Sequence, residues 1–215
     1  MWISARVKFA QLNAPENCCQ LLLRAAAKRP YRILTAFAVV AVLGVGAWAD
    51  REWLLRSLAE LWIVSDPIGQ ADAVAVFGGG LADRPFAAAQ YYRYGLVKKV
   101  LVDGSDSEAV LLTLGTPASA IETFGNALRN THEEVLALRD WAARHNLRSI
   151  IVPTELFSTR RVRWTLHRAF PSDLEIRVVA LDPSRYRRGG WWRRTDGITA
   201  FRTEVIKYLY YRLKY

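Results

Sequence analysis

The chain starts with a polar, basic segment and then changes to an uninterrupted apolar run at residues 33–49. This run, ILTAFAVVAVLGVGAWA, contains no charged residue and a single hydroxyl group. Seventeen residues of helix are about 26 Å long, which is at the short end of what crosses a bilayer core. Trp48 lies at one edge of the run, where an indole ring favours the membrane interface. The pattern therefore predicts one transmembrane helix near the N-terminus.

The charges on either side of the apolar run predict its orientation. Residues 1–32 carry six Lys and Arg residues and one acid, Glu16, whereas the residues directly after the run are mixed in charge. Because basic flanks stay in the cytoplasm, we expect residues 50–215 to lie outside it. Two alternatives stay open. Ala47-Trp48-Ala49 resembles a signal-peptidase site, and an apolar helix can also be buried in a protein core.

The residues after the run predict a stem followed by one globular domain. Apolar residues recur at near-helical spacing over residues 51–64, which indicates an amphipathic helix that lies along the membrane or packs on the domain as ordinary core. About 150 residues remain, enough for one domain with its own core. The predicted parts are a basic cytoplasmic segment (1–32), a transmembrane helix (33–49), a stem (50–65) and an α/β domain (66–215).

Short apolar segments alternate with helical segments throughout the globular part. Apolar runs without a polar face suit parallel strands that are buried on both sides. Strands are predicted at residues 71–77, 97–102, 119–123, 148–152 and 175–179. Helices are predicted at residues 84–95, 106–114, 130–145, 158–169 and 196–212. This order is typical of an α/β, Rossmann-like fold, which has a doubly wound, mostly parallel sheet with helices on both faces.

Ligands of such sheets bind at the carboxyl ends of the strands, and a glycine loop follows the first strand. Gly78, Gly79 and Gly80 let backbone N–H groups approach an anion closely, and Arg84 could add a guanidinium group. The loop is neither a P-loop nor the dinucleotide-binding fingerprint, because it lacks Gly-Lys-Ser/Thr and a third spaced glycine. An ordinary tight turn and a solvated arginine would explain the same residues.

The second strand is followed by Gly104, Ser105 and then Glu108 in the first turn of a predicted helix. A glycine at a strand end admits the backbone near a site, and Glu108 could face the loop. The helix dipole stabilises a carboxylate at this position without any function.

The fourth strand is followed by Thr154, Ser158, Arg160 and Arg161 at the start of a helix. Positive charge in a first helical turn opposes the dipole, so it invites an anion to offset it. A solvated basic face is the alternative. The predicted helix before this strand begins with Asn130 or Thr131 as its cap.

The net charge of +10 is scattered over three segments rather than concentrated on one recognition element. Membrane lipid or an anionic ligand explains this pattern at least as well as DNA does, and we expect no nucleic acid partner. The two cysteines are adjacent, which excludes a disulfide framework, and the three histidines lack metal-ligand spacing. No metal site is predicted.

Together, these motifs resemble the YdcF/SanA/ElyC family of bacterial envelope-associated proteins over about residues 71–170. The resemblance is carried by Gly78-Gly79-Gly80, Arg84, Tyr92, Gly95, Gly104, Glu108, Gly115-Thr116-Pro117, Ile121-Glu122, Asn130-Thr131, Glu133-Glu134, Val152-Pro153-Thr154 and Phe157-Ser158-Thr159-Arg160-Arg161. It implies a Rossmann-like fold, an anchor in the bacterial inner membrane and a link to envelope and peptidoglycan-related processes. One member is linked to S-adenosylmethionine. Many members have a histidine where this chain has Ser158, so a proton transfer by that histidine would need another group here.

The expected function is to bind, and if the protein is an enzyme to transform, an anionic small molecule or a lipid-linked envelope precursor. The expected ligand-binding residues are Gly78, Gly79, Gly80, Arg84, Gly104, Ser105, Thr131, Thr154, Ser158, Arg160 and Arg161. The residues expected to orient the ligand or move protons are Glu108, Asn130 and Glu134. The cofactor stays unknown. The alternatives are a non-enzymatic envelope factor that holds a protein or lipid partner through residues 185–194, and an S-adenosylmethionine or nucleotide binder.

Overall fold

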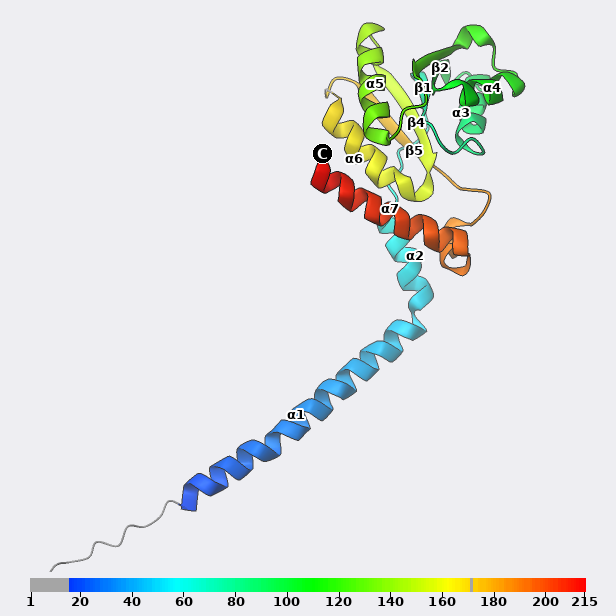
Figure 1. The fold of residues 1–215 in the computed structure, drawn as a ribbon. Helices are drawn as coiled ribbons and strands as arrows, with labels where there is room; N and C mark the ends of the chain where they lie inside the picture. The colour runs from blue at the N-terminus through cyan, green and yellow to red at the C-terminus, as the bar shows by residue number, and fades with distance from the viewer. Residues whose placement is uncertain (1–15, 171) are drawn as a thin grey trace, which may run out of the picture. The chain divides into compact units, whose positions relative to one another are not determined.

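The computed structural model describes residues 16–170 and 172–215, with side chains for residues 31–170 and 172–215. The chain divides into two compact units, residues 1–52 and 53–215. The first unit contains one long helix, α1 (Glu16–Ala49), shown in blue in Figure 1. Its stretch Tyr31–Ala49 is long and apolar enough to cross a membrane, with a mean hydropathy of 1.9. The helix begins before the predicted span, so part of the predicted basic segment is also helical, while its first 15 residues lie outside the described part of the chain.

The second unit is built on a five-stranded sheet. Its strands are β1 (Ala71–Val76), β2 (Val97–Asp103), β3 (Ile121–Gly125), β4 (Ser149–Glu155) and β5 (Glu175–Leu181). Every pairing is parallel, and the strand order is β3-β2-β1-β4-β5. The strands coincide with the five predicted segments to within a few residues, and the predicted mostly parallel sheet is confirmed.

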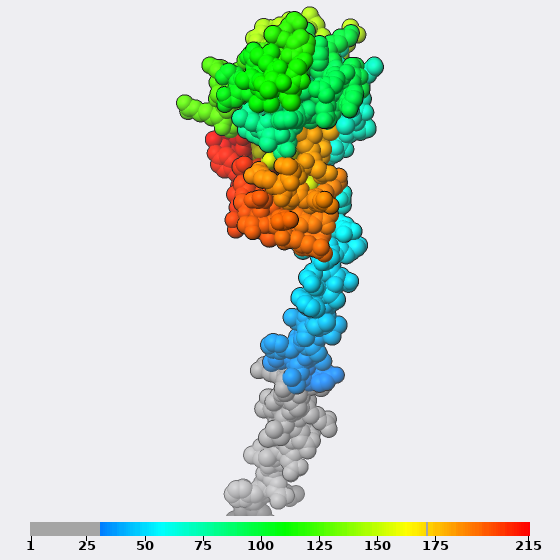
Figure 2. All heavy atoms as spheres, turned by 90° about the vertical axis from the view of Figure 1, so that its right-hand side faces the viewer, coloured from blue at the N-terminus to red at the C-terminus, as the bar shows by residue number. Residues whose placement is uncertain are grey.

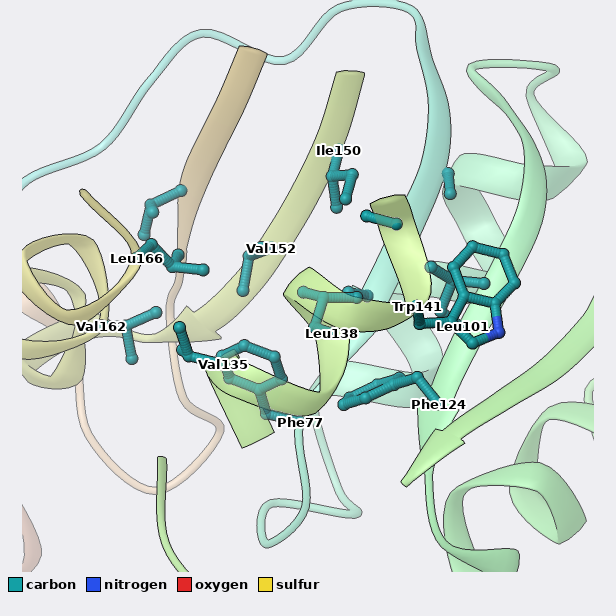
Figure 3. Close-up of a cluster of buried hydrophobic side chains, with 14 residues drawn as sticks. Phe77, Leu101, Phe124, Val135, Leu138, Trp141, Ile150, Val152, Val162 and Leu166 are labelled. Carbon is teal, nitrogen blue, oxygen red and sulfur yellow. The ribbon is translucent and has the colours of Figure 1, made fainter. Parts of the chain in front are cut away.

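Helices cover both faces of the sheet. One face is covered by α3 (Arg84–Arg93) and α4 (Ser105–Thr113), and the other by α5 (Thr131–Arg144) and α6 (Thr159–Ala169). Side chains of β1 alternate between the two resulting cores, as the two-residue period of a strand requires. Val74 packs with α3 and α4, whereas Ala75 packs with α5 and α6, in the core that Figure 3 shows around Leu138 and Val152. The doubly wound α/β fold is therefore confirmed.

A third, smaller core joins the predicted stem to the C-terminal part of the unit. It is formed by α2 (Arg51–Trp62), the short helices η2 (Leu156–Ser158) and η3 (Arg188–Arg193), and α7 (Thr195–Lys214). Phe157 lies at its centre, and the indole N–H of Trp62 donates a hydrogen bond to the Phe157 carbonyl (2.9 Å). One face of the stem thus packs as ordinary core. In Figure 2 the orange and red residues of this region lie against the rest of the unit.

The strand order places a topological switch point between β1 and β4. From β1 the chain passes through α3 to β2 on one side, and it returns through α5 to β4 on the other. The connections therefore leave the carboxyl ends of these two neighbouring strands in opposite directions. Sheets of this kind open a ligand-binding crevice at such a point.

Candidate functional site

A cavity of about 620 Å³ opens at the carboxyl ends of β1 and β4. It brings together the glycine loop after β1, the first turns of α5 and α6, and the inner face of α7. Its wall is formed by Gly78, Gly79, Gly80, Arg84, Leu128, Arg129, Asn130, Thr131, Glu134, Glu155, Ser158, Arg161, Arg185, Glu204, Lys207, Tyr210 and Tyr211. Nine of the fourteen residues expected to form the site are among them. The cavity therefore unites the loops after β1 and β4, as a site at the switch point requires.

Arg84 stabilises the glycine loop by donating hydrogen bonds to backbone carbonyl groups at its start. Its guanidinium Nη1 donates hydrogen bonds to the carbonyl oxygens of Phe77 (3.2 Å) and Gly78 (2.8 Å), and the side chain is 9% exposed. A Cβ atom at Gly80 would lie 3.3 Å from its Nε, and Gly80 has a φ of +102° that favours glycine. Arg84 thus stabilises the conformation of the loop. It also places a positive charge next to the loop, because an arginine stays protonated even where burial lowers its pKa.

Glu134 is a buried carboxyl group with direct access to the cavity. Its Oε1 accepts a hydrogen bond from the N–H of Gly78 (2.5 Å), and only 4% of the residue is exposed. Burial raises the pKa of Glu134 to about 7, and this effect outweighs the Gly78 N–H and Arg84, which lower it. The residue can therefore hold or release a proton near neutral pH.

Arg161 links three helices at the wall of the cavity. Its Nε donates to Oε2 of Glu204 on α7 (2.8 Å), and its Nη1 donates to the hydroxyl of Thr131 on α5 (2.7 Å). The guanidinium also lies 5.2 Å from the centre of the Tyr211 ring. Lys207 approaches the other carboxylate oxygen of Glu204 at 3.1 Å. Although burial raises the pKa of Glu204, the two cations outweigh it and hold that pKa below the usual value.

Asn130 caps α5. Its Oδ1 accepts hydrogen bonds from the N–H groups of His132 and Glu133 (both 3.1 Å), while its amide donates to Oε1 of Glu133 (2.7 Å). Oε2 of Glu133 accepts in return from the N–H of Arg129 (3.1 Å). This reciprocal cap satisfies the free donors at the helix start. Asn130 reaches the cavity wall, but its polar atoms are engaged in the cap.

Five of the expected residues lie outside this cavity. Arg160 turns away, toward α2, where its guanidinium donates to the carbonyls of Leu61 and Trp62. Thr154 is only 1% exposed, so its side chain is buried near the carboxyl end of β4. Glu108 lies in the first turn of α4, outside the residues that line either cavity at this end of the sheet. The remaining two, Gly104 and Ser105, line a neighbouring cavity.

That neighbouring cavity, of about 430 Å³, lies on the other side of the glycine loop, at the end of β2. Its wall is formed by Gly78, Gly79, Gly80, Leu81, Asp103, Gly104, Ser105, Asp106, Ser107, Ala127 and Leu128. Asp103 is 4% exposed, and its Oδ2 accepts from the N–H of Leu128 (2.9 Å). Burial raises the pKa of Asp103. The two charged residues of this wall, Asp103 and Asp106, are both acidic, whereas most charged residues in the wall of the first cavity are basic.

The sequence patterns did not identify the part that α7 plays in the cavity. Glu204, Lys207, Tyr210 and Tyr211 all come from this helix, and Arg185 comes from the segment before it. The spacing of residues along α7 nevertheless indicated this role. Glu204 falls on the same helical face as Gly197 and Tyr211, which are both buried, and a carboxylate among buried positions needs a cation close by.

Comparison with known proteins does not name a relative. Neither a scan against models of protein families nor a search of curated proteins finds a match to this chain.

Proposed function

We propose that residues 53–215 bind an anionic small molecule that carries a phosphate or carboxylate group in the cavity between β1 and β4. We propose further that α1 anchors this domain on the outer side of a bacterial inner membrane. The observation that carries the binding proposal is the convergence on one cavity of a glycine loop, the first turns of α5 and α6, and the guanidinium of Arg161. The N–H groups of Gly78, His132 and Glu133 are already bound by Glu134 and Asn130. The first turn of α6 and the cations of the wall are therefore what would meet the negative charge of the ligand.

The charges of the wall support an anionic ligand. Five of its residues are basic and three are acidic. Glu204 stays ionised beside Arg161 and Lys207 and offsets one of their two charges, whereas the raised pKa of Glu134 leaves that carboxyl partly protonated near neutral pH. The basic residues therefore outnumber the ionised acids, and the wall keeps a net positive charge. A volume of about 620 Å³ lies within the range of small-molecule sites, roughly 300–1,000 Å³.

Glu134 is the group that would exchange a proton with the ligand in a chemical step. A general acid or base works best when its pKa lies near the working pH, and Glu134 meets that condition at the cavity wall. Glu108 does not line this cavity, and the side chain of Asn130 is committed to the cap. The resemblance to the YdcF/SanA/ElyC family supports a lipid-linked envelope precursor as one source of the anion. Nucleotides and S-adenosylmethionine are alternatives that the same assay separates.

The alternative of a partner-binding factor receives less support. Trp191 is 4% exposed and belongs to the third core, and Arg188 pairs with Glu60. The tryptophan on which this alternative rests is thus committed to packing within the unit, although Arg185, Arg187 and Arg194 of the same segment are exposed.

Calorimetry on the full-length protein in detergent tests the binding proposal. The probes are inorganic phosphate, pyrophosphate, adenosine monophosphate and S-adenosylmethionine. We expect saturable binding of at least one phosphate probe, weakened about tenfold by Arg185→Gln, because a charged hydrogen bond contributes roughly 1.5–3 kcal/mol. Arg185 is 66% exposed at its side chain, so its replacement should leave the fold intact. Arg144→Gln, on the exposed last turn of α5, is the matched control and should bind normally. An absence of saturable binding, or equal losses in both variants, contradicts the proposal.

The orientation is tested by fusing alkaline phosphatase after Tyr215. The fusion should be active if the domain lies outside the cytoplasm, whereas a fluorescent reporter that folds only in the cytoplasm should stay dark. The opposite pattern contradicts the orientation. A soluble product that begins at Asp50 would show that the N-terminal helix is a cleaved signal.

A further inference from the structure

The outward face of α7 carries a row of exposed apolar side chains. Ile198, Ile206, Leu209 and Leu213 are 45%, 62%, 56% and 89% exposed. Their spacing places them on one side of the helix, opposite the side on which Glu204 and Tyr211 are buried. Contiguous apolar side chains are unfavourable when they are exposed to water. A row of this kind therefore indicates a surface that another molecule covers.

A second exposed apolar row lies on the neighbouring helix α2. Leu54, Leu58 and Leu61 are 42%, 44% and 75% exposed. The two helices touch through Trp62, whose ring packs edge-on against Phe201 (5.6 Å) and Tyr208 (5.5 Å) of α7. Figure 1 also shows α2 and α7 next to each other on the same side of the domain. Each of these two touching helices thus presents a row of exposed apolar side chains.

The charges on α7 favour anionic lipid as the occupant of this surface. Its exposed charged residues are basic, apart from Asp196 in the first turn. They are Arg202, Arg212 and Lys214, together with Lys207, which lies at the cavity and pairs with Glu204. Arg202 lies within the apolar row itself, between Ile198 and Ile206. An apolar helix face flanked by basic residues is the pattern by which helices lie on anionic membrane surfaces.

The connection to α1 limits how far along the chain α2 can extend from the end of the apolar stretch. α2 begins at Arg51, two residues after the apolar stretch ends at Ala49. Its 12 residues span about 18 Å, so Leu61 cannot lie farther than that along the helix from Arg51. We propose that the outward faces of α2 and α7 dock on an anionic lipid surface. This inference rests on the proposed membrane anchor but not on the proposed ligand. Since the inner face of α7 lines the cavity, docking of the outward face would leave the thickness of this helix, about 10 Å, between the cavity and the lipid.

A site-specific probe in the full-length chain tests the docking. Cys18 and Cys19 are replaced by serine, Leu209→Cys is labelled with an environment-sensitive fluorophore, and the protein is placed in nanodiscs of phosphatidylcholine with or without phosphatidylglycerol. Brominated lipid should quench the label at residue 209 in the anionic discs. Leu112→Cys on α4 is the matched control, because Leu112 is 44% exposed and lies in a different part of the domain. Its label should not be quenched.

A charge variant then tests why the surface docks. Arg202→Gln should lower the ratio of docked to undocked protein about fivefold, because one basic group near an anionic surface has about that effect. Arg144→Gln, on the exposed end of α5, should change nothing.

The outcomes separate the docking from the anchor. Flotation of the full chain with phosphatidylcholine vesicles, which lack the anionic lipid that favours docking, reports the anchor, so a chain that fails to float contradicts the anchor. A chain that floats while the label at residue 209 stays as unquenched as the label at residue 112 overturns the docking. A label that is shielded from water but is not quenched by brominated lipid also overturns it, because a protein partner or a second copy would then cover the surface.

Discussion

The glycine loop after β1 separates two cavities that share its backbone but differ in charge. Toward β4 the wall contains Arg84, Arg129, Arg161, Arg185 and Lys207 against three acids. Toward β2 the charged residues of the wall are Asp103 and Asp106. Because Gly78, Gly79 and Gly80 line both cavities, the loop alone does not decide where an anion binds. The helices that frame each cavity supply the difference.

The first turns of those helices show how the difference arises. α4 begins with Asp106 and Glu108, and these carboxylates already offset the positive end of its dipole. The first turn of α6 contains no acid and instead carries Arg160 and Arg161. Its positive end is therefore not offset by its own sequence. An anion in the cavity toward β4 would satisfy both the α6 dipole and the cations around it, whereas one toward β2 would meet Asp106 of α4 and Asp103 of β2.

The largest effect is expected from Arg161→Gln. The change leaves the buried Glu204 without its strongest partner and removes the donor to Thr131. Breaking a buried ion pair in this way costs about 3–5 kcal/mol of unfolding free energy. Arg160→Gln, one residue earlier, should cost much less, since that side chain binds two carbonyl groups of α2, one part-buried and one exposed, and leaves no buried charge unpaired. Chemical denaturation of the full-length protein measures both. Equal losses would show that the buried network is not what stabilises this wall.

These two arginines also show how far the sequence could be interpreted. The alternation of apolar runs and helices predicted all five strands, because strands buried on both faces have a distinctive composition. It also placed the glycine loop and the starts of α5 and α6 at one end of the sheet. It could not show that Arg160 points toward α2 while Arg161 points into the cavity, because that depends on where α2 and α7 pack. Contacts between distant segments, such as Arg161 with Glu204, follow from tertiary structure and not from local pattern.

The next effect concerns the pH dependence of stability through Glu134. Since its pKa is raised from 4.5 to about 7 in the folded protein, folding favours the protonated form. The contribution of Glu134 to the free energy of unfolding is therefore most favourable below pH 4.5. About 3 kcal/mol of this contribution is lost as the pH rises from 4.5 to about 7. Glu134→Gln should remove this dependence, so its stability relative to the wild type should increase from pH 5 to pH 8. Denaturant titrations at several pH values measure the difference. A difference that does not vary with pH would mean that Glu134 titrates normally.

A smaller effect is expected on the acidic side from Gly125→Ala. A Cβ atom there would lie 2.4 Å from Oδ1 of Asp103 and 2.8 Å from Cδ1 of Leu128, so both side chains must move. Overpacking of this kind costs about 1–3 kcal/mol. Gly189→Ala is the control, because a Cβ atom at Gly189 meets nothing within 4 Å. The double variant with Asp103→Ala should lose less stability than the sum of the single changes. Strict additivity would show that Asp103 is not what the added methyl group displaces.

The smallest effect tests the charge difference between the cavities most directly. Asp106 is exposed in the first turn of α4, so Asp106→Asn should cost only about 0.5 kcal/mol of stability through the lost dipole interaction. If the anion binds toward β4, the phosphate affinity should stay nearly unchanged, because exposed charges on the far side of the loop are screened by salt. If the anion binds toward β2, removing a carboxylate from that wall should strengthen binding several-fold, since like charges near a ligand oppose it. Calorimetry with the phosphate probes at constant ionic strength distinguishes these results. Stronger binding by Asp106→Asn together with unchanged binding by Arg185→Gln would show that the ligand binds in the cavity toward β2 and not in the cavity toward β4.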